Sequence, residues 1–279
     1  MTDIPHSIAV LGLGLMGGSL ARALRACRPD AHLVAWTPDG LEPDRAMRSG
    51  VIDVAAPEAA GAVRSAELVV LAAPVGASIA LLDAIARHLP PDALVTDVCS
   101  VKMPLLLAAE EAGLAERFAG SHPLCGSHRE GWDSARADLY HGARVYVIPS
   151  ADNATTRSIE AMWTAIGARP ERIDAQQHDA DMAWISHAPQ VLASALGASL
   201  AAAGIPAERL GPGGRDMTRL SASSPVLWSD LLTQNRTHVV DVLTAVNARI
   251  TAIMHAIESD DRVALEALLR AAREWAEET

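Results

Sequence analysis

Residues 7–19 are Ser-Ile-Ala-Val-Leu-Gly-Leu-Gly-Leu-Met-Gly-Gly-Ser, and this stretch decides the fold. Its first five residues (7–11) have the apolar and β-branched composition of a buried strand. The glycines that follow match the pattern G-x-G-x-x-G, and apolar residues at helical spacing continue as far as Cys27. Glycines between a strand and a helix allow a tight turn, and they let a pyrophosphate approach the positive end of the helix. We therefore predict a dinucleotide site formed by Gly12, Gly14, Leu15, Met16 and Gly17.

The rest of the first half alternates strand-like and helix-like segments. An amphipathic helix is predicted near residues 79–88. Strands are predicted at residues 32–36, 68–72, 93–97, 117–120 and 144–148. Alternation at this spacing predicts an α/β fold with a doubly wound, Rossmann-type parallel sheet and right-handed crossovers.

After about residue 150 the strand signals fade and alanine- and leucine-rich helical patterns take over, apart from a possible last strand at 172–174. Residues 178–203 are predicted to form one helix kinked at Pro189, because proline breaks the hydrogen-bond ladder. The glycine-rich loop 211–214 follows, and residues 225–279 are predicted to form two or three further helices. We divide the chain into a dinucleotide-binding domain (1–150) and an all-helical substrate and dimerisation domain (151–279). We expect a homodimer through the C-terminal helices.

Composition narrows the class of protein. The chain has 279 residues and a formal net charge of −11, which disfavours nucleic acid or an anionic membrane as a partner. No apolar run approaches the length of a membrane span, and the N-terminus has no basic signal segment. Cys27, Cys99 and Cys125 form no CxxC pair, so we expect reduced thiols, no metal site and a cytoplasmic location. Lys102 is the only lysine in the chain.

The end of the second predicted strand leaves the choice of dinucleotide open. An acidic residue commonly holds the ribose hydroxyls of NAD at this position, but here Thr37 follows Trp36. A neutral residue is more usual where the 2′-phosphate of NADP must fit, yet no arginine follows Thr37 to hold that phosphate. Asp39 lies two residues further on and is within reach of the ribose. NAD and NADP therefore both remain candidates.

Three segments follow strand ends, where doubly wound folds bind their ligands. Ala73-Pro74 closes the third strand and is placed to pass under the nicotinamide. Asp97-Val98-Cys99-Ser100-Val101-Lys102 closes the fourth, and Gly120-Ser121-His122-Pro123 follows the fifth. His122, held between proline and glycine, is a candidate general base for an alcohol proton. A purely structural turn histidine is an equally good interpretation of the spacing.

These segments carry a family resemblance. The chain resembles the prephenate and arogenate dehydrogenases of tyrosine biosynthesis in five motifs that occur in the expected order, together with Trp228 and Asn235. The motifs are Gly-Leu-Gly-Leu-Met-Gly-Gly-Ser (12–19), Asp-Val-Cys-Ser-Val-Lys (97–102), Gly-Ser-His-Pro-Leu-Cys-Gly-Ser (120–127), Ile-Ser-His-Ala-Pro (185–189) and Gly-Arg-Asp-Met-Thr-Arg (214–219).

The resemblance implies a specific reaction. A base takes the hydroxyl proton of a carboxylated cyclohexadienol while hydride leaves the same carbon for NAD or NADP. Carbon dioxide is then lost and the ring becomes aromatic. By similarity His122 is the base, and Ser100 hydrogen-bonds the substrate hydroxyl and the cofactor.

The resemblance also implies the residues that hold the substrate. Arg219 is expected to anchor a substrate carboxylate. Arg215 is expected to brace the same loop through Asp216. His187 is expected to support the substrate site from behind, although it and His178 are equally well explained as structural helix histidines near a proline.

Two departures from the family pattern bear on the substrate. Prephenate-preferring members often have a second histidine where this chain has Gln190. Glu130 resembles the acidic residue that pairs with the amino group of arogenate, and a carboxylate there attracts an ammonium and repels a keto acid. Capping of a helix or contact with water is the alternative explanation of Glu130. We therefore expect arogenate as substrate, with prephenate as the alternative.

Two other classes of protein share this general build. β-Hydroxy-acid dehydrogenases and imine reductases use a catalytic lysine or another residue on the helix behind the sheet, and they lack the Ser-His-Pro and Arg-Asp-x-Thr-Arg motifs. A regulator that senses a dinucleotide without catalysis would need a DNA-binding or partner module, and the sequence offers no helix-turn-helix segment for one.

Overall fold

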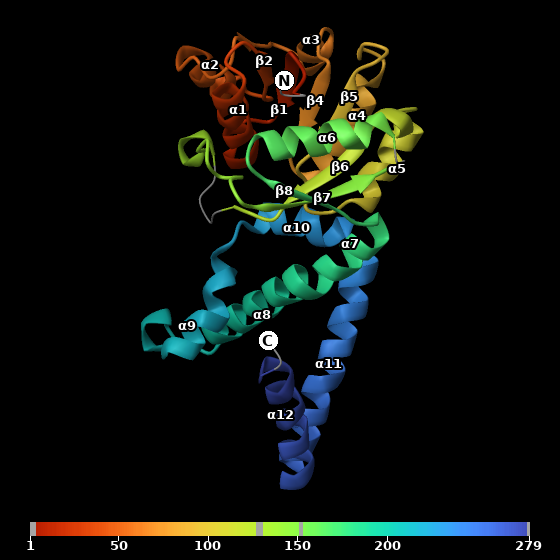
Figure 1. Cartoon of the computed structure of the whole chain (residues 1–279). Helices are drawn as coiled ribbons and strands as arrows, with labels where there is room; N and C mark the ends of the chain where they lie inside the picture. The colour runs from red at the N-terminus through yellow and green to blue at the C-terminus, as the bar shows by residue number, and fades with distance from the viewer. Residues whose placement is uncertain (1–3, 127–130, 151–152, 278–279) are drawn as a thin grey trace. The chain divides into compact units, whose positions relative to one another are not determined.

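The structure, a computed structural model, describes residues 4–126, 131–150 and 153–277. The chain forms two compact units (Figure 1). The first unit comprises Met1–Met182 and Ser221–Asn235, and the second comprises Ala183–Leu220 and Arg236–Thr279. This division keeps residues 151–182 with the first unit, whereas the sequence predicts a domain change after residue 150.

A five-stranded parallel sheet organises the first unit and confirms the predicted Rossmann-type fold. Its strands lie in the order β3-β2-β1-β4-β5, with bounds β1 (Ser7–Leu11), β2 (His32–Trp36), β3 (Val54–Ala55), β4 (Leu68–Leu71) and β5 (Leu94–Asp97). The helices between them are α1 (Leu15–Cys27), α2 (Leu41–Arg48), α3 (Ala59–Val63) and α4 (Val75–Ala86), and α5 (Met103–Glu111) follows β5. β3 was not predicted because two residues are too few to show a periodic pattern.

The strand register brings the carboxyl ends of four strands to one edge. Leu11 pairs with Trp36 on one side and with Leu71 on the other, and Leu71 pairs with Asp97. The peptide groups beyond these ends continue the pairing, since Gly12 N donates to Trp36 O at 2.8 Å and Val98 N donates to Leu71 O at 3.0 Å. The predicted glycine turn and the residues after β2, β4 and β5 therefore share one edge of the sheet.

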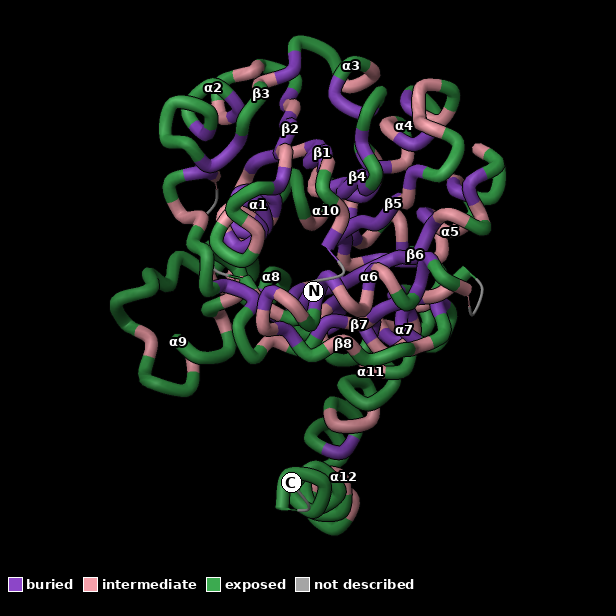
Figure 2. Tube along the Cα trace, turned by 45° about the horizontal axis from the view of Figure 1, so that its top comes forward, coloured by how far each residue is buried: buried purple, intermediate pink, exposed green. Residues whose placement is uncertain are grey.

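Both faces of this sheet are buried, as a parallel sheet requires. Ile8 and Val10 point into one apolar cluster with Leu20 and Leu24 of α1. Ala9 and Leu11 point into a second cluster on the opposite face, together with Leu82 of α4 and Leu105 of α5. Figure 2 shows most of β1, β4 and β5 as buried.

A separate three-stranded sheet follows, and it corrects the expectation that residues 117–120 and 144–148 extend the parallel sheet. β6 (Ala119–Pro123), β7 (Arg144–Pro149) and β8 (Arg169–Arg172) lie in that order, with β6 and β7 antiparallel and β7 and β8 parallel. Among the described residues, the isolated bridge between Val95 and Phe118 is the only β-bridge between β5 and this segment. The last strand lies at 169–172 instead of 172–174. Short apolar runs indicate strands but not their partners.

Helices and short turns complete the first unit. α6 (Ala154–Ala165) packs against the second sheet (Figure 1) and buries Trp163 and Met162. The remaining elements are η1 (Ala115–Arg117), η2 (Trp132–Ser134), α7 (Ala175–Met182) and α10 (Pro225–Gln234).

The second unit is helical. Its elements are the π-helical turn η3 (Ala183–His187), α8 (Ala188–Ala202), η4 (Ala207–Arg209), α9 (Pro212–Thr218), α11 (Arg236–Glu258) and α12 (Arg262–Glu277). The short turn η5 (Arg219–Ala222) spans the division between the units. The single helix predicted over residues 178–203 is confirmed, since helical structure continues without a break from Ala175 to Ala202. Its irregularity is the π turn at Ala183–His187, which directly precedes Pro189, the second residue of α8. A proline removes one N–H from the helical hydrogen-bond ladder, and such irregular turns are common beside it.

Candidate active site

The glycine turn after β1 fits a dinucleotide. Gly12 has φ +105°, and a Cβ built there would lie 2.4 Å from the carbonyl oxygen of Ala72. A Cβ on Gly17 would lie 1.9 Å from the carbonyl oxygen of Gly12, whereas a Cβ on Gly14 would meet no atom within 4 Å. Two glycines thus allow close backbone packing, and the third faces open space at the start of α1.

The N-terminus of α1 is also electrostatically suited to an anion. Gly14 caps the helix without a side-chain hydrogen bond, and the first turn contains no acidic residue. The peptide N–H groups of Leu15 and Met16 therefore start a helix whose dipole favours a negatively charged ligand. These residues would hold the pyrophosphate of NAD or NADP.

The end of β2 carries a fixed negative charge. The hydroxyl of Thr37 donates to Asp39 Oδ1 at 3.0 Å, and Leu41 N donates to the same oxygen at 3.2 Å. The backbone bond from Leu41 and the side-chain bond from Thr37 lower the pKa of Asp39, so its exposed carboxylate is ionised at neutral pH. Glu42 and Asp44 in the first turn of α2 add further negative charge nearby.

Cys99 connects the residues after β5 to those after β4. Its thiol contacts the carbonyl oxygen of Ala73 and the hydroxyl of Ser78, both at 3.4 Å, and its N–H donates to Asp97 Oδ2 at 2.8 Å. Burial raises the pKa of Cys99 to about 12, so the side chain remains a thiol and offers no nucleophile. Ser100, the next residue, is half-buried.

A buried ion pair joins the first sheet to the second. Lys102 and Asp97 are 1% and 0% exposed and form a salt bridge. Lys102 Nζ also donates to Ser121 O at 2.7 Å, and Asp97 Oδ1 accepts from Ser121 N at 3.0 Å. The Ser121 hydroxyl contacts Thr96 Oγ1 and Trp163 Nε1, each at 2.9 Å. Strand β6 is therefore held at the carboxyl end of β5.

His122 follows Ser121 on β6, and successive side chains of a strand point to opposite faces. Its imidazole is 9% exposed, and its Nδ1 lies 2.8 Å from His178 Nε2 of α7. His178 Nδ1 in turn lies 2.8 Å from Asp179 Oδ1. His122 thus lies within the second sheet and not in a loop after a fifth parallel strand. It contacts His178, which the sequence identifies only as a histidine of a helix.

The remaining predicted substrate residues belong to the second unit or are not described. His187 ends the π turn η3, and Arg219 is exposed at the start of η5. Arg215 donates to the carbonyl oxygen of Leu210, and within the described part of the chain it forms no ion pair with Asp216. The expected bracing through Asp216 is therefore replaced by a backbone contact. Glu130 lies outside the described residues.

Gln190 leaves one acceptor without a partner. It is 4% exposed, and its Nε2 donates to Leu220 O at 2.9 Å and to Ser194 Oγ at 3.1 Å. Among the described residues, no group hydrogen-bonds its Oε1. A buried acceptor of this kind is expected to receive a hydrogen bond from water or a ligand.

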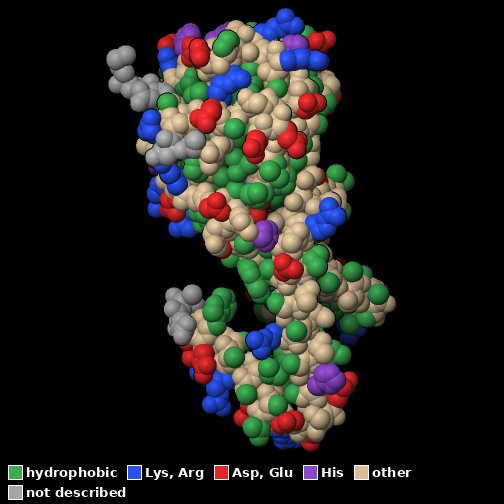
Figure 3. Space-filling model, turned by 90° about the vertical axis from the view of Figure 1, so that its right-hand side faces the viewer, with side chains coloured by type: hydrophobic (Ala, Val, Ile, Leu, Met, Phe, Trp, Pro, Cys, Tyr) green, Lys and Arg blue, Asp and Glu red, His purple; other side chains and the backbone are tan. Residues whose placement is uncertain are grey.

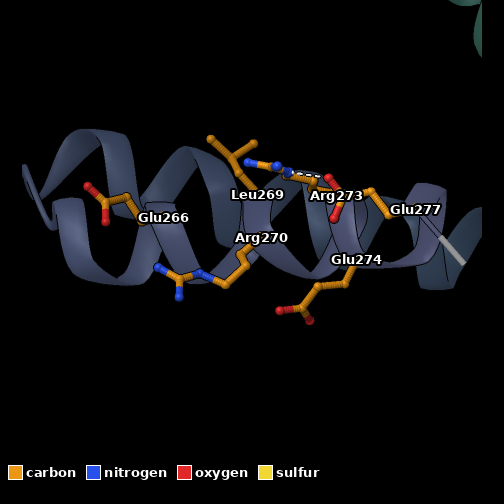
Figure 4. Close-up of a pocket in the computed structure, with 6 residues that line it drawn as sticks. All are labelled: Glu266, Leu269, Arg270, Arg273, Glu274 and Glu277. Atoms are coloured by element: carbon orange, nitrogen blue, oxygen red, sulfur yellow. Dashed lines mark hydrogen bonds and ion pairs between the residues drawn. The ribbon is translucent and has the colours of Figure 1, made fainter.

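No group of three or more His, Cys, Asp and Glu side chains in residues 4–126, 131–150 and 153–277 is arranged to hold a metal ion. A shallow hollow along α12 (Figure 4) is lined by Leu269 and by charged side chains of both signs from this single helix. Two of them, Arg273 and Glu277, form an ion pair at 2.7 Å. Such a row of charges is typical of a solvated helix face.

Comparison with known proteins agrees with this geometry. A family model described as the nucleotide-binding domain of prephenate dehydrogenase matches residues 20–171, and one described as the dimerization domain of prephenate dehydrogenase matches residues 174–271. The cyclohexadienyl dehydrogenase of Zymomonas mobilis is 32% identical over 268 residues, which cover 94% of this chain and 91% of the relative.

Solved structures give the same result for the fold. The prephenate dehydrogenase of Aquifex aeolicus, in complex with hydroxyphenyl propionate and NAD+, matches with a TM-score of 0.88 and 25% identity over 98% of both chains. Synechocystis arogenate dehydrogenase matches with a TM-score of 0.82 and 25% identity, over 98% of this chain and 99% of that chain.

Proposed function

Because this chain belongs to the prephenate dehydrogenase family, we propose that it catalyses the NAD-dependent oxidative decarboxylation of arogenate to tyrosine. The observation that carries the proposal is the placement of His122. The buried pair of Lys102 and Asp97 holds its strand beside the sheet edge that bears the glycine turn and Ser100. A base, a hydroxyl and a dinucleotide cradle are the parts that dehydrogenation of an alcohol needs.

Different residues of this chain have different roles in the proposed reaction. The bound dinucleotide supplies the hydride acceptor. His122 removes the proton of the ring hydroxyl, and Ser100 orients that hydroxyl. Arg219 anchors a carboxylate of the substrate, and Arg215 and His187 support the surrounding loop and helix start. Loss of carbon dioxide then makes the ring aromatic, which renders the overall conversion effectively irreversible.

Two residues support arogenate over prephenate, which differ in carrying an amine or a keto group. Glu130 offers a carboxylate to an ammonium and repels a keto acid. Gln190 has a buried carbonyl oxygen without a partner among the described residues, and an amine can donate to it whereas a keto group cannot. Prephenate is the second candidate, since the relatives include enzymes named for it.

Replacing Glu130 by Gln tests the substrate. The variant keeps the shape of the side chain and removes its charge, so we expect kcat/KM for arogenate to fall by about tenfold or more while the value for prephenate changes little or rises. Initial rates with both substrates measure the ratio. An equal loss on both substrates contradicts the assignment of Glu130.

We propose NAD as the preferred cofactor because the end of β2 is acidic. The carboxylate of Asp39 is ionised and tied to Thr37 and Leu41, where it would accept hydrogen bonds from ribose hydroxyls and repel a 2′-phosphate. A matrix of initial rates, with arogenate and prephenate each paired with NAD and NADP, tests cofactor and substrate together. A higher kcat/KM with NADP than with NAD contradicts this choice.

The helices of the second unit support a homodimer. α11 contains a stretch with mean hydropathy 1.3, of which only 11% is buried, and it is long and apolar enough to cross a membrane by length and composition alone. Its side chains form a heptad stripe, at steps of three and four residues: Val240, Leu243, Asn247, Ile250, Met254 and Ile257. Four of these apolar side chains are 44–61% exposed. Apolar heptads with one polar member are typical of helices that pair with another helix.

A second copy of this chain is the occupant that we propose for this stripe, since the matching family model is that of a dimerization domain. Figure 3 shows hydrophobic side chains interspersed with charged ones on the face of the second unit that is turned to the viewer. We place the dimer in the cytoplasm, in keeping with three free cysteines.

A further inference from the structure

The contacts of Asp179 determine which of its neighbours donates. Lys102 N donates to Asp179 Oδ1 at 2.8 Å, and Met103 N donates to Oδ2 at 2.9 Å. Both N–H groups come from the start of α5, where a carboxylate is favoured by the helix dipole. Both oxygens of this carboxylate therefore accept from backbone N–H groups, and a carboxylate has no proton of its own to donate. His178 Nδ1, at 2.8 Å from Oδ1, must therefore be the N–H donor of that contact.

The tautomer of His178 then determines that of His122. A neutral imidazole with a proton on Nδ1 has its lone pair on Nε2. His178 Nε2 is thus an acceptor, and His122 Nδ1, 2.8 Å away, must donate to it. In the neutral ring of His122 the lone pair consequently lies on Nε2, the nitrogen that can take a proton from a hydroxyl.

The surroundings hold this chain of three side chains in place. The rings of His122 and His178 meet edge to face with centroids 5.1 Å apart, and Tyr146, the cross-strand partner of His122, meets His178 with centroids 5.7 Å apart. Asn235, which follows α10, donates to the carbonyl oxygen of Asp179 at 2.7 Å. Of the described residues packed around this chain, Lys102 and Asp97 are also ionisable, and they pair with each other.

We propose that His178 and Asp179 are positioning residues that set the tautomer of His122 and stabilise its charged form. When His122 takes the substrate proton it becomes an imidazolium, and the hydrogen bond to His178 and the charge of Asp179 beyond it favour that cation. No proton needs to leave His122 along this chain, and no other reactant is required. The role in catalysis rests on the proposed function, whereas the tautomer does not.

Nuclear magnetic resonance of the full-length enzyme with ¹⁵N-labelled histidine tests the tautomer directly. The signals of His122 are assigned by their loss in His122→Gln. At a pH where the ring is neutral we expect its proton on Nδ1 in the free enzyme. A proton on Nε2 overturns the proposal, whether or not either substrate is turned over.

Two substitutions of His178 test the catalytic consequence. His178→Leu removes the acceptor, and we expect kcat to fall by about 100-fold with KM and NAD affinity unchanged. The acidic limb of the kcat/KM profile should move to lower pH because the imidazolium loses its support. His178→Gln keeps an acceptor oxygen and is expected to stay within about tenfold of the unmodified enzyme. Equal losses in both variants, or an acidic limb that does not move, overturn the proposal.

Asp174→Asn is the matched control for the helix. Asp174 accepts from the N–H groups of Gln176 and Gln177 at the start of α7 but does not touch His122. We expect this variant to retain kcat and the position of the acidic limb. If it instead behaves like His178→Leu, the effect arises from disturbance of α7 and the proposal is rejected. If neither substrate is turned over by the unmodified enzyme, the proposed function fails and the resonance experiment alone decides the tautomer.

Discussion

A substitution of His122 can separate catalysis from binding of the dinucleotide. His122→Asn retains a polar side chain on β6 but removes the base, so kcat is expected to fall by about 1,000-fold. The glycine turn is untouched, and the affinity for NAD should stay within about twofold. Steady-state kinetics and calorimetric titration with NAD measure the two quantities. Near-normal turnover in this variant eliminates His122 as the base.

Lys102 is a buried cation whose contribution to the free energy of unfolding depends on its partner, Asp97. Lys102→Met leaves the carboxylate of Asp97 buried without its cation, which is expected to lower the free energy of unfolding by about 3–5 kcal/mol. Adding Asp97→Asn should restore part of the loss, because the uncompensated charge is removed. Urea unfolding measures both variants.

An exposed pair provides the control for Lys102. Arg273 and Glu277 of α12 are also within ion-pair distance, at 2.7 Å, but their side chains are 77% and 61% exposed. Arg273→Met should change the free energy of unfolding by less than about 1 kcal/mol. Comparable losses from Arg273→Met and Lys102→Met would mean that burial is not the cause.

At the scale of the elements, the turn between β1 and α1 is the proposed binding site of the dinucleotide. Gly14→Ala adds a methyl group where the protein leaves open space and where the pyrophosphate must approach the backbone. We expect the affinity for NAD to fall by about tenfold or more, with the thermal midpoint unchanged within about 2 °C. Titration calorimetry and thermal unfolding measure these changes.

Gly61→Ala is the matched control for that turn. Gly61 lies in α3 (Ala59–Val63), and a Cβ there also meets no atom within 4 Å. This variant should bind NAD normally, because it lies away from the carboxyl edge of the sheet. Weakened binding in Gly61→Ala, or normal binding in Gly14→Ala, argues against the assigned role of the turn.

At the scale of the whole molecule, we expect the proposed dimer to depend on the heptad stripe of α11. Met254→Glu places a charge in the middle of this stripe, and burying it against a second copy is unfavourable, so we expect the dimer to dissociate. Sedimentation velocity over a range of concentrations measures the change. Ala248→Glu, on the same helix but off the stripe, should remain dimeric. A dimer that persists in Met254→Glu places the interface elsewhere.

Local sequence determined much of this protein. The strand, glycine turn and helix at residues 7–27 are specified by neighbouring residues, because buried parallel strands require continuous apolar runs and the turn requires glycine. Local sequence patterns also placed the residues after β4 and β5 at the carboxyl edge of the sheet, where doubly wound folds bind their ligands. Family motifs identified His122, Ser100 and Arg219 as candidates, and the family itself is confirmed.

Tertiary structure decided the strand pairing and the hydrogen-bond partners that local sequence patterns do not encode. Strand β6 pairs with β7 and not with the parallel sheet, since a strand's partner depends on contacts between residues distant in sequence. The chain of Asp179, His178 and His122 joins residues 56 and 57 positions apart, and its hydrogen-bond directions follow from backbone donors of α5. Sequence by itself therefore named the candidate base, whereas only the fold shows its buried partners, because hydrogen bonds between distant elements leave no periodic signal along the chain.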